Sequence, residues 1–219
     1  IMSILKIVLT FTLFAHAALA QAPLTRPESL SVSSSRLAQI DSVIADEIAK
    51  KKLPGAVVLA GRKGRVVWQK AYGDRVLEPA REVMTVDTIF DLASLTKVVA
   101  TATSIMILVE RGKVRLTDPV SLHIPELKGE GRDRITIEHL LTHVSGYAPD
   151  FDLKERWTGY DEAIKRLIQE PLRNPPGSRF TYSDIGFIAL GGVVARAGGM
   201  PLDEFAQKNI FGPLGMKST

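Results

Sequence analysis

A serine and a lysine three residues apart, Ser94 and Lys97, form the pair in this chain with the clearest chemical potential. Positions three apart share one face of a helix, so a helical Ser94-Leu95-Thr96-Lys97 segment would set the amine beside the hydroxyl. A serine hydroxyl is a weak nucleophile near neutral pH unless a neighbouring group assists it. The spacing therefore predicts a lysine-assisted serine nucleophile, the chemistry of acyl transfer.

The context of this pair supports the prediction more than the pattern does, because Ser3-Ile4-Leu5-Lys6 matches the same pattern. An apolar, strand-like run at residues 88–93 precedes Ser94. The residues that follow are apolar around most of a helical circumference until Gly112. We expect a helix over residues 94–111 that is buried at the centre of its domain, with Ser94 at its start.

A second candidate is Tyr182, which lies between a Pro-Pro-Gly-Ser loop at residues 175–178 and a predicted helix at 184–197. A tyrosine beside a lysine cation has a lowered pKa, and its oxygen can take a proton from a serine. Taken alone, Tyr182 is more typical of a half-buried tyrosine at a helix start.

The remaining pattern indicates one hairpin followed by helices. Apolar spacing predicts a helix at 36–50 with Ser35 as its N-cap, and strands at 56–61 and 65–73 around a turn at 62–64. Shorter helices are expected near 118–123, 137–142, 160–170 and 202–210. Because a lone two-stranded hairpin is only marginally stable, we expect the rest of the sheet to lie beyond Thr219.

Composition narrows the function classes. Lysine and arginine number 28 and aspartate and glutamate 24, which gives a net charge of +4. This excess is too small and too scattered to predict a nucleic-acid partner. The chain has no cysteine, which excludes disulfides, thiolate catalysis and cysteine metal sites.

The first residues have the pattern of an export signal. Lys6 supplies a positive charge, residues 7–14 are apolar, and Ala18-Leu19-Ala20 is a small-x-small cleavage site. The apolar run is too short to cross a bilayer comfortably, so no stable membrane span is predicted. We expect a signal peptide at 1–20, a lead-in at 21–35 and one domain at 36–219, in an exported protein that is periplasmic or secreted.

Other signals carry less weight. His139 and His143 have the spacing of a zinc-binding helix, but Leu140 stands where such a site has its glutamate, so no metal or other cofactor is predicted. His143 is better interpreted as a polar group that ties a helix end to a loop. Trp68 and Trp157 are expected to be core or rim aromatics.

Several stretches, in the same order along the chain, resemble the class C β-lactamase and penicillin-binding serine hydrolase family over about residues 36–219. They are Gly55-Ala56-Val57-Val58 with Gly64-x-Val66-Val67, Ser94-x-x-Lys97, Leu116-Thr117-Asp118-Pro119-Val120, residues 135–146 with Leu140-Leu141-Thr142-His143-Val144-Ser145-Gly146, Tyr182-Ser183-Asp184, and Pro213-Leu214-Gly215-Met216. The resemblance implies an α/β (α+β) fold with an antiparallel sheet, incomplete here, and a helical domain.

The resemblance also implies roles for four residues. Ser94 would be the acylated nucleophile, Lys97 would shuttle its proton, and Tyr182 would be the general base. Asp184 stands where the family usually has a substrate-binding asparagine, and a carboxylate accepts hydrogen bonds but donates none. An aspartate in place of the asparagine therefore argues against recognition of a substrate amide. The Ser94 N–H is expected to form half of an oxyanion hole.

One family element is missing from the sequence, a Lys/His-x-Gly triplet on a strand that borders the cleft. We therefore expect a C-terminally truncated copy with weak or absent turnover. The predicted function is an exported serine hydrolase acting on β-lactams, D-Ala-D-Ala peptides from peptidoglycan, or esters. The alternative is a non-catalytic binding or scaffold protein. The sequence leaves the oligomeric state open.

Overall fold

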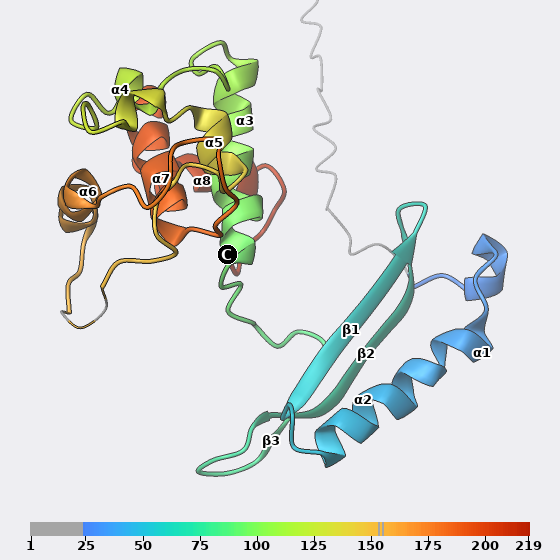
Figure 1. Cartoon of the computed structure of the whole chain (residues 1–219). Coiled ribbons are helices and arrows are strands. Elements are labelled where there is room, and N and C mark those ends of the chain that lie inside the picture. The colour runs from blue at the N-terminus through green and yellow to red at the C-terminus, as the bar shows by residue number, and fades with distance from the viewer. Residues whose placement is uncertain (1–23, 153, 155) are drawn as a thin grey trace, which may run out of the picture. The chain divides into compact units, whose positions relative to one another are not determined.

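The computed structural model describes residues 24–152, 154 and 156–219, and the predicted signal peptide lies outside the described residues. The chain divides into two compact units, residues 1–90 and 91–219. Figure 1 labels the helices and strands of each unit.

The first unit contains an antiparallel sheet and two helices. Its strands are β1 (Gly55–Arg62), β2 (Arg65–Val76) and β3 (Glu82–Val83), in the order β1-β2-β3. Its helices are α1 (Ser34–Leu37) and α2 (Gln39–Ala49), which follow a short 3-10 turn at Pro27–Leu30. Helix α2 packs against β2 along one face of the sheet (Figure 1).

The predicted hairpin is confirmed, and both strands run a little further than their patterns indicated. Gly55 pairs with Gly73 and Arg62 with Arg65, and a bulge interrupts the register between Ala60 and Gly61. Strand β3 was not predicted, because two residues in a charged loop carry no alternating pattern.

The predicted N-cap of the first helix is wrong by two residues. The Ser33 hydroxyl accepts the N–H of Arg36 at 3.3 Å, and Ser35 is not the cap. The helix begins earlier than its apolar stripe, and a break at Ala38 divides it into α1 and α2.

The second unit is helical. A π-helical segment at Lys97–Ala102 runs into α3 (Thr103–Glu110). The other helices of the unit are α4 (Val120–His123), α5 (Ile137–Leu141), α6 (Tyr160–Gln169), α7 (Asp184–Gly198) and α8 (Leu202–Ala206), with a 3-10 turn at Arg132–Arg134 and a π-helical turn at Gln207–Phe211. All the helices predicted here are present, with boundaries that differ by a few residues.

Helix α7 is the central helix of this unit. It contacts α3, α4, α5, α6 and α8, and nine of its residues are buried from Ile185 to Val194. A helix that is apolar around most of its circumference must be covered on several sides, as α7 is. No single helix among the described residues is long and apolar enough to span a membrane; α7 and the segment Leu202–Phe211 meet that test only as a pair bent by 70°.

The expectation that residues 94–111 form the buried central helix is wrong. Ile105 and Leu108 are buried, but Leu95, Val98 and Met106 are each about half exposed or more. This helix therefore buries one face against α7 and leaves another apolar face exposed. The central position that the sequence pattern predicted for residues 94–111 is occupied by α7.

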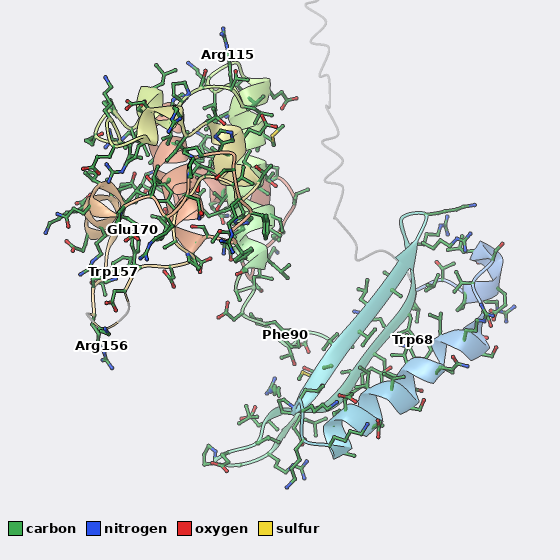
Figure 2. All side chains as sticks on the ribbon, in the orientation of Figure 1. Trp68, Phe90, Arg115, Arg156, Trp157 and Glu170 are labelled. Carbon is green, nitrogen blue, oxygen red and sulfur yellow. The ribbon has the colours of Figure 1, made fainter. Side chains whose placement is uncertain are left out.

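Both tryptophans, which Figure 2 labels, are half-buried, as predicted. Trp68 on β2 donates its indole N–H to the Tyr72 hydroxyl at 3.2 Å. Trp157 meets the ring of Phe151 edge to face at 5.6 Å, and the Arg166 guanidinium lies over its ring at 5.4 Å. Trp157 also packs against the apolar core of the second unit.

Gly146 allows two loops of the second unit to approach closely. Its φ is +90°, and a Cβ there would lie 2.1 Å from the carbonyl oxygen of Asn174. The Gly146 carbonyl also accepts the N–H of Arg173 at 2.8 Å. A side chain at this position would push apart the loops that lead to α7.

Gly146→Ala should therefore lower the free energy of unfolding by about 2–4 kcal/mol, since it adds a backbone clash to the strain of a positive φ. Gly112→Ala is the matched control: its φ is +66° but its Cβ would meet nothing within 4 Å. We expect it to cost about 1 kcal/mol. Urea unfolding of both variants measures the difference, and equal losses would contradict the close approach.

Candidate active site

Ser94 lies at the start of its helix because of a strained turn before it. Ala93 has a φ of 43°, unusual for a residue with a Cβ, and its N–H donates to the Asp91 carboxylate at 2.8 Å. The chain then enters the helix, and Ser94 is exposed. Within the described residues, the Ser94 N–H donates to no recorded acceptor. It therefore has the free donor that an oxyanion hole requires.

Lys97 reaches back over one helical turn to the serine. Its Nζ donates to the Ser94 Oγ at 3.1 Å, as the spacing predicted. The turn that carries Lys97 is π-helical, and the Thr103 hydroxyl donates to the carbonyl of Val98, five residues earlier, at 2.8 Å. Such π-helical turns are rare and occur frequently at functional sites. The sequence pattern gave no sign of this one.

The start of α7 is fixed by a buried serine. Ser183 accepts the N–H of Gly186 at 3.2 Å as the N-cap and donates its hydroxyl to the Ala148 carbonyl at 2.6 Å. The Asp184 N–H donates to the Pro149 carbonyl at 2.7 Å. The backbone on both sides of the cap is therefore held, which limits where the Tyr182 and Asp184 side chains can go.

These two segments meet at the Lys97 ammonium. Lys97 forms an ion pair with Asp184 and lies 4.9 Å from the centre of the Tyr182 ring. The Lys97 side chain is only 14% exposed, against 44% for that of Asp184. All four predicted site residues therefore gather around one nearly buried cation.

The contacts decide the protonation of this cluster. Burial works to lower the pKa of Lys97, but hydrogen bonds with Asp184 and Tyr182 outweigh burial and raise that pKa. Hydrogen bonds from Ser94 and then from Lys97 lower the pKa of Tyr182. Lys97 is therefore held as a cation, and formation of the Tyr182 phenolate, which can accept a proton, is favoured.

A pocket of about 510 Å³ opens beside the cluster and is lined by Ser94, Lys97 and Asp184. The rest of its wall is mainly apolar and includes Thr101, Tyr160, Ala163, Phe187, Ile188, Gly191 and Leu202. A substrate group in this pocket would meet hydrocarbon on most sides, with the polar groups gathered at the end near Ser94.

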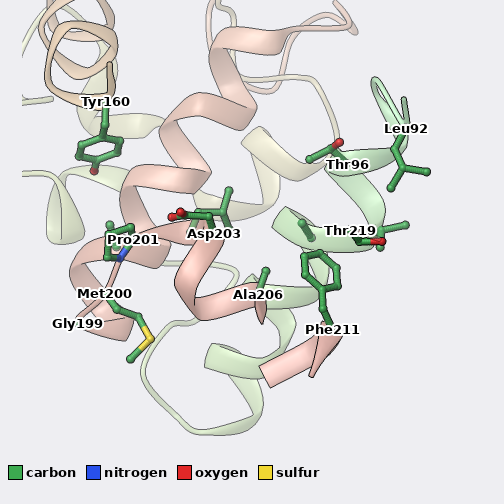
Figure 3. A pocket seen from close by; sticks show the side chains of 14 residues that line it. Leu92, Thr96, Tyr160, Gly199, Met200, Pro201, Asp203, Ala206, Phe211 and Thr219 are labelled. Carbon is green, nitrogen blue, oxygen red and sulfur yellow. The ribbon is translucent and has the colours of Figure 1, made fainter. Parts of the chain in front are cut away.

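A larger apolar pocket of about 760 Å³ adjoins it (Figure 3). It shares Thr96, Tyr160 and Leu202 with the Ser94 pocket, and its wall runs past Met200 and Phe211 to Thr219. The site residues Ser94, Lys97, Tyr182 and Asp184 do not line it. Because it lacks the reactive groups, we treat it as separate from the candidate active site.

The two histidines with zinc-like spacing have other partners. The His139 ring accepts the Thr136 N–H at 3.4 Å and closes the capping box of α5. His143 accepts the Ser183 N–H through Nδ1 at 3.0 Å, so it ties a helix end to a loop, as predicted. In the part of the chain that the structure describes, no group of three potential ligands is arranged to hold a metal ion.

Comparison with known proteins agrees with this arrangement. The Beta-lactamase family model matches residues 40–219. The chain belongs to the β-lactamase family. Its helical unit and small antiparallel sheet are those of the β-lactamase and penicillin-binding-protein fold. A solved class C β-lactamase matches this chain with a TM-score of 0.72 and 25% sequence identity. The match covers 86% of this chain and 51% of that β-lactamase.

Two curated relatives of this β-lactamase-family chain have hydrolase names. Esterase EstB of Burkholderia gladioli is 34% identical over 87% of this chain and 53% of its own length. A putative D-alanyl-D-alanine carboxypeptidase of Salmonella agona is 30% identical over 97% of this chain and 54% of its own length. The chain therefore spans about half the length of the curated relatives that it matches.

The sequence predicts the four residues that gather here and the tie made by His143, but it gives no role to Ser183, which caps α7. A serine directly before a predicted helix is nevertheless a recognisable N-cap signal. The contacts of His143 with the tyrosine loop had no local signal, because 39 residues separate His143 from Tyr182. Such contacts are decided by the way the loops pack.

Asp184→Asn should move both limbs of the pH–rate profile to lower pH. Burial lowers the pKa of Lys97, and the hydrogen bond and charge of Asp184 oppose that effect. Without the carboxylate, the pKa of Lys97 therefore falls. The charge of Asp184 also works to raise the pKa of Tyr182, so its removal lowers that pKa too. The measurement is the rate of Ser94 acylation by an activated ester from acid to alkaline pH.

Asp203→Asn is the matched control, because Asp203 lines the larger pocket and not the Ser94 pocket. It should leave both limbs where they are. A profile of Asp184→Asn that coincides with the wild type, or that moves to higher pH, would show that the carboxylate does not govern these two groups.

Proposed function

We propose that this chain carries the nucleophile, the cation and the base of an exported serine hydrolase that works through an acyl-enzyme. One observation carries the proposal: the Lys97 ammonium donates to the Ser94 oxygen at 3.1 Å while it is paired with Asp184 and stacked against Tyr182. This is the arrangement that an assisted serine nucleophile needs.

In the first step, the Ser94 oxygen attacks the carbonyl carbon of the substrate and its proton passes to the oxygen of Tyr182, which begins as the phenolate. The bond from the carbonyl carbon to the leaving oxygen or nitrogen then breaks, and the leaving group takes that proton. In the second step a water molecule, deprotonated by Tyr182, attacks the ester of Ser94. The acid product leaves, and the proton returns to Ser94.

The division of labour follows from the direction of the pKa shifts. Lys97 has a raised pKa, so at neutral pH it is an ammonium and has no lone pair with which to take the serine proton. Tyr182 has a lowered pKa, because Ser94 and Lys97 hydrogen-bond to its oxygen. Tyr182 is therefore the base, and Lys97 keeps the phenolate stable.

Esters are the substrate class that this site favours over β-lactams. Asp184 lines the pocket and offers only acceptors, so it cannot donate to the side-chain amide carbonyl of a penicillin. The mainly apolar wall suits an acyl chain with no such carbonyl. The relative named as an esterase supports ester hydrolysis.

The test is covalent labelling of Ser94. The purified protein should be acylated by p-nitrophenyl butyrate, with a burst of p-nitrophenol and a mass increase on the peptide that contains Ser94. Acylation by a fluorescent penicillin should be slower by about tenfold or more, as expected when one amide hydrogen bond is missing and a carboxylate faces the carbonyl. Ser94→Ala should abolish both reactions.

Asp184→Asn serves as the specificity control, because it restores a donor at the same position. It should narrow the gap between ester and penicillin. If neither probe labels the folded protein, the proposal fails and a non-catalytic binding or scaffold role is favoured. If the penicillin reacts faster than the ester, only the substrate class is wrong.

We also propose export to the periplasm or the outside of the cell. The support is the sequence pattern alone: Lys6, the apolar residues 7–14 and the small residues at Ala18 and Ala20. N-terminal sequencing of the protein from its native host should begin at Gln21. A mature protein that retains residues 1–20 would contradict cleavage.

A further inference from the structure

We propose that His143 is a positioning residue that holds the Tyr182 phenol against Lys97 and Ser94. This inference rests on the proposed function, since it concerns the residue that acts there as the base. The two rings are stacked, with their centres 4.4 Å apart and their planes at 29°. His143 therefore forms the support beneath the Tyr182 ring, on a segment that contributes no reactive group.

His143 also holds the backbone on both sides of Tyr182. Its carbonyl oxygen accepts the N–H of Thr181 at 2.8 Å, and its Nδ1 accepts the N–H of Ser183 at 3.0 Å. One residue therefore contacts the tyrosine and both of its neighbours in the chain. Such a clamp fixes the backbone and the ring together.

The position of His143 is itself well determined. It follows α5 in a left-handed conformation with a φ of 59°, which turns its ring toward the loop. Phe180 meets the ring edge to face at 5.9 Å, and Phe187 lies tilted at 5.0 Å. Two aromatic rings thus hold the imidazole in place, and the Tyr182 ring is the third that it contacts.

Tyr182 needs this support because much of it is open. Its side chain is 45% exposed, so packing alone restrains it little. The Lys97 ammonium lies 4.9 Å from the ring centre, and the oxygen must also reach Ser94. A misplacement of about 1 Å in a catalytic group can cost roughly 10²-fold in rate.

The clamp requires a neutral imidazole. Because Nδ1 accepts the Ser183 N–H, the proton of the neutral ring lies on Nε2. The charged groups that face His143 are Lys97 and Asp184, with the Tyr182 phenol stacked on it. Burial first, and then Lys97, lower the pKa of His143, while Asp184 opposes them. The ring therefore stays neutral through the neutral pH range.

Three substitutions separate the parts of the clamp. His143→Ala removes both the ring and the acceptor. His143→Asn keeps an acceptor and tolerates a positive φ, but loses the stack. His143→Phe keeps the stack and loses the acceptor. His139→Ala is the matched control, because this histidine, one helical turn earlier, closes the capping box of α5 with Thr136.

Two readouts follow the base. The first is the pKa of Tyr182, from the ¹³Cζ signals of the four tyrosines, with Tyr182 assigned by its loss in Tyr182→Phe. The second is the rate of Ser94 acylation by p-nitrophenyl butyrate, resolved into the rate at saturation and the ester concentration that gives half of it. His143→Ala should raise the pKa of Tyr182 toward its ordinary value, because the oxygen drifts from Ser94 and Lys97.

His143→Ala should also slow saturated acylation by roughly 100-fold, with the half-saturating ester concentration changed by less than about threefold. His143→Asn and His143→Phe should each recover part of this loss. His139→Ala should lower the stability of the protein without changing the pKa of Tyr182.

The proposal is overturned if His143→Ala keeps the wild-type pKa of Tyr182 and is acylated at a rate within twofold of the wild type. If His143→Ala does not fold, the same result for both His143→Asn and His143→Phe overturns it. It is also overturned if His139→Ala reproduces the same losses. If the wild type does not acylate at all but His143→Ala still raises the pKa of Tyr182, the proposed function fails and the positioning role stands.

Discussion

The arrangement of this site depends on one ammonium group that is held mostly out of water. A cation in such a place is stable only when anionic or polar partners surround it. Lys97 has three such partners: the Ser94 oxygen, the Asp184 carboxylate and the Tyr182 phenol. The same contacts that stabilise the charge also bring together Ser94, Tyr182 and Asp184, which we propose as the nucleophile, the base and a specificity residue.

The rest of the helical unit acts to bring two distant segments to that charge. Helix α7, covered by helices on several sides, carries Asp184 in its first turn, and the buried Ser183 caps it. The loop before it is held by hydrogen bonds from Thr181 and Ser183 to His143. The hydrophobic core thus fixes the helices, and a few buried polar contacts fix the reactive side chains on them.

Much of this could be predicted from the sequence. The hairpin, the order of the helices and the contact between Ser94 and Lys97 are local consequences of apolar periodicity and of spacing along a helix. The wrong N-cap was a local boundary error, whereas the wrong central helix concerns competition between segments. Residues 94–111 and α7 are both apolar enough for a central position, and only packing decided that α7 takes it.

The sequence by itself determined which functional groups are available, a serine hydroxyl, a lysine amine and a tyrosine phenol, and that Ser94 and Lys97 share a helical turn. The tertiary structure alone decided that Asp184 pairs with Lys97 rather than facing solvent, and that the pKa of Tyr182 is lowered. It also decided that His143 lies beneath Tyr182. The physical reason is that charge interactions and ring stacking act over a few ångströms in space, between residues that are some forty to ninety positions apart in the chain.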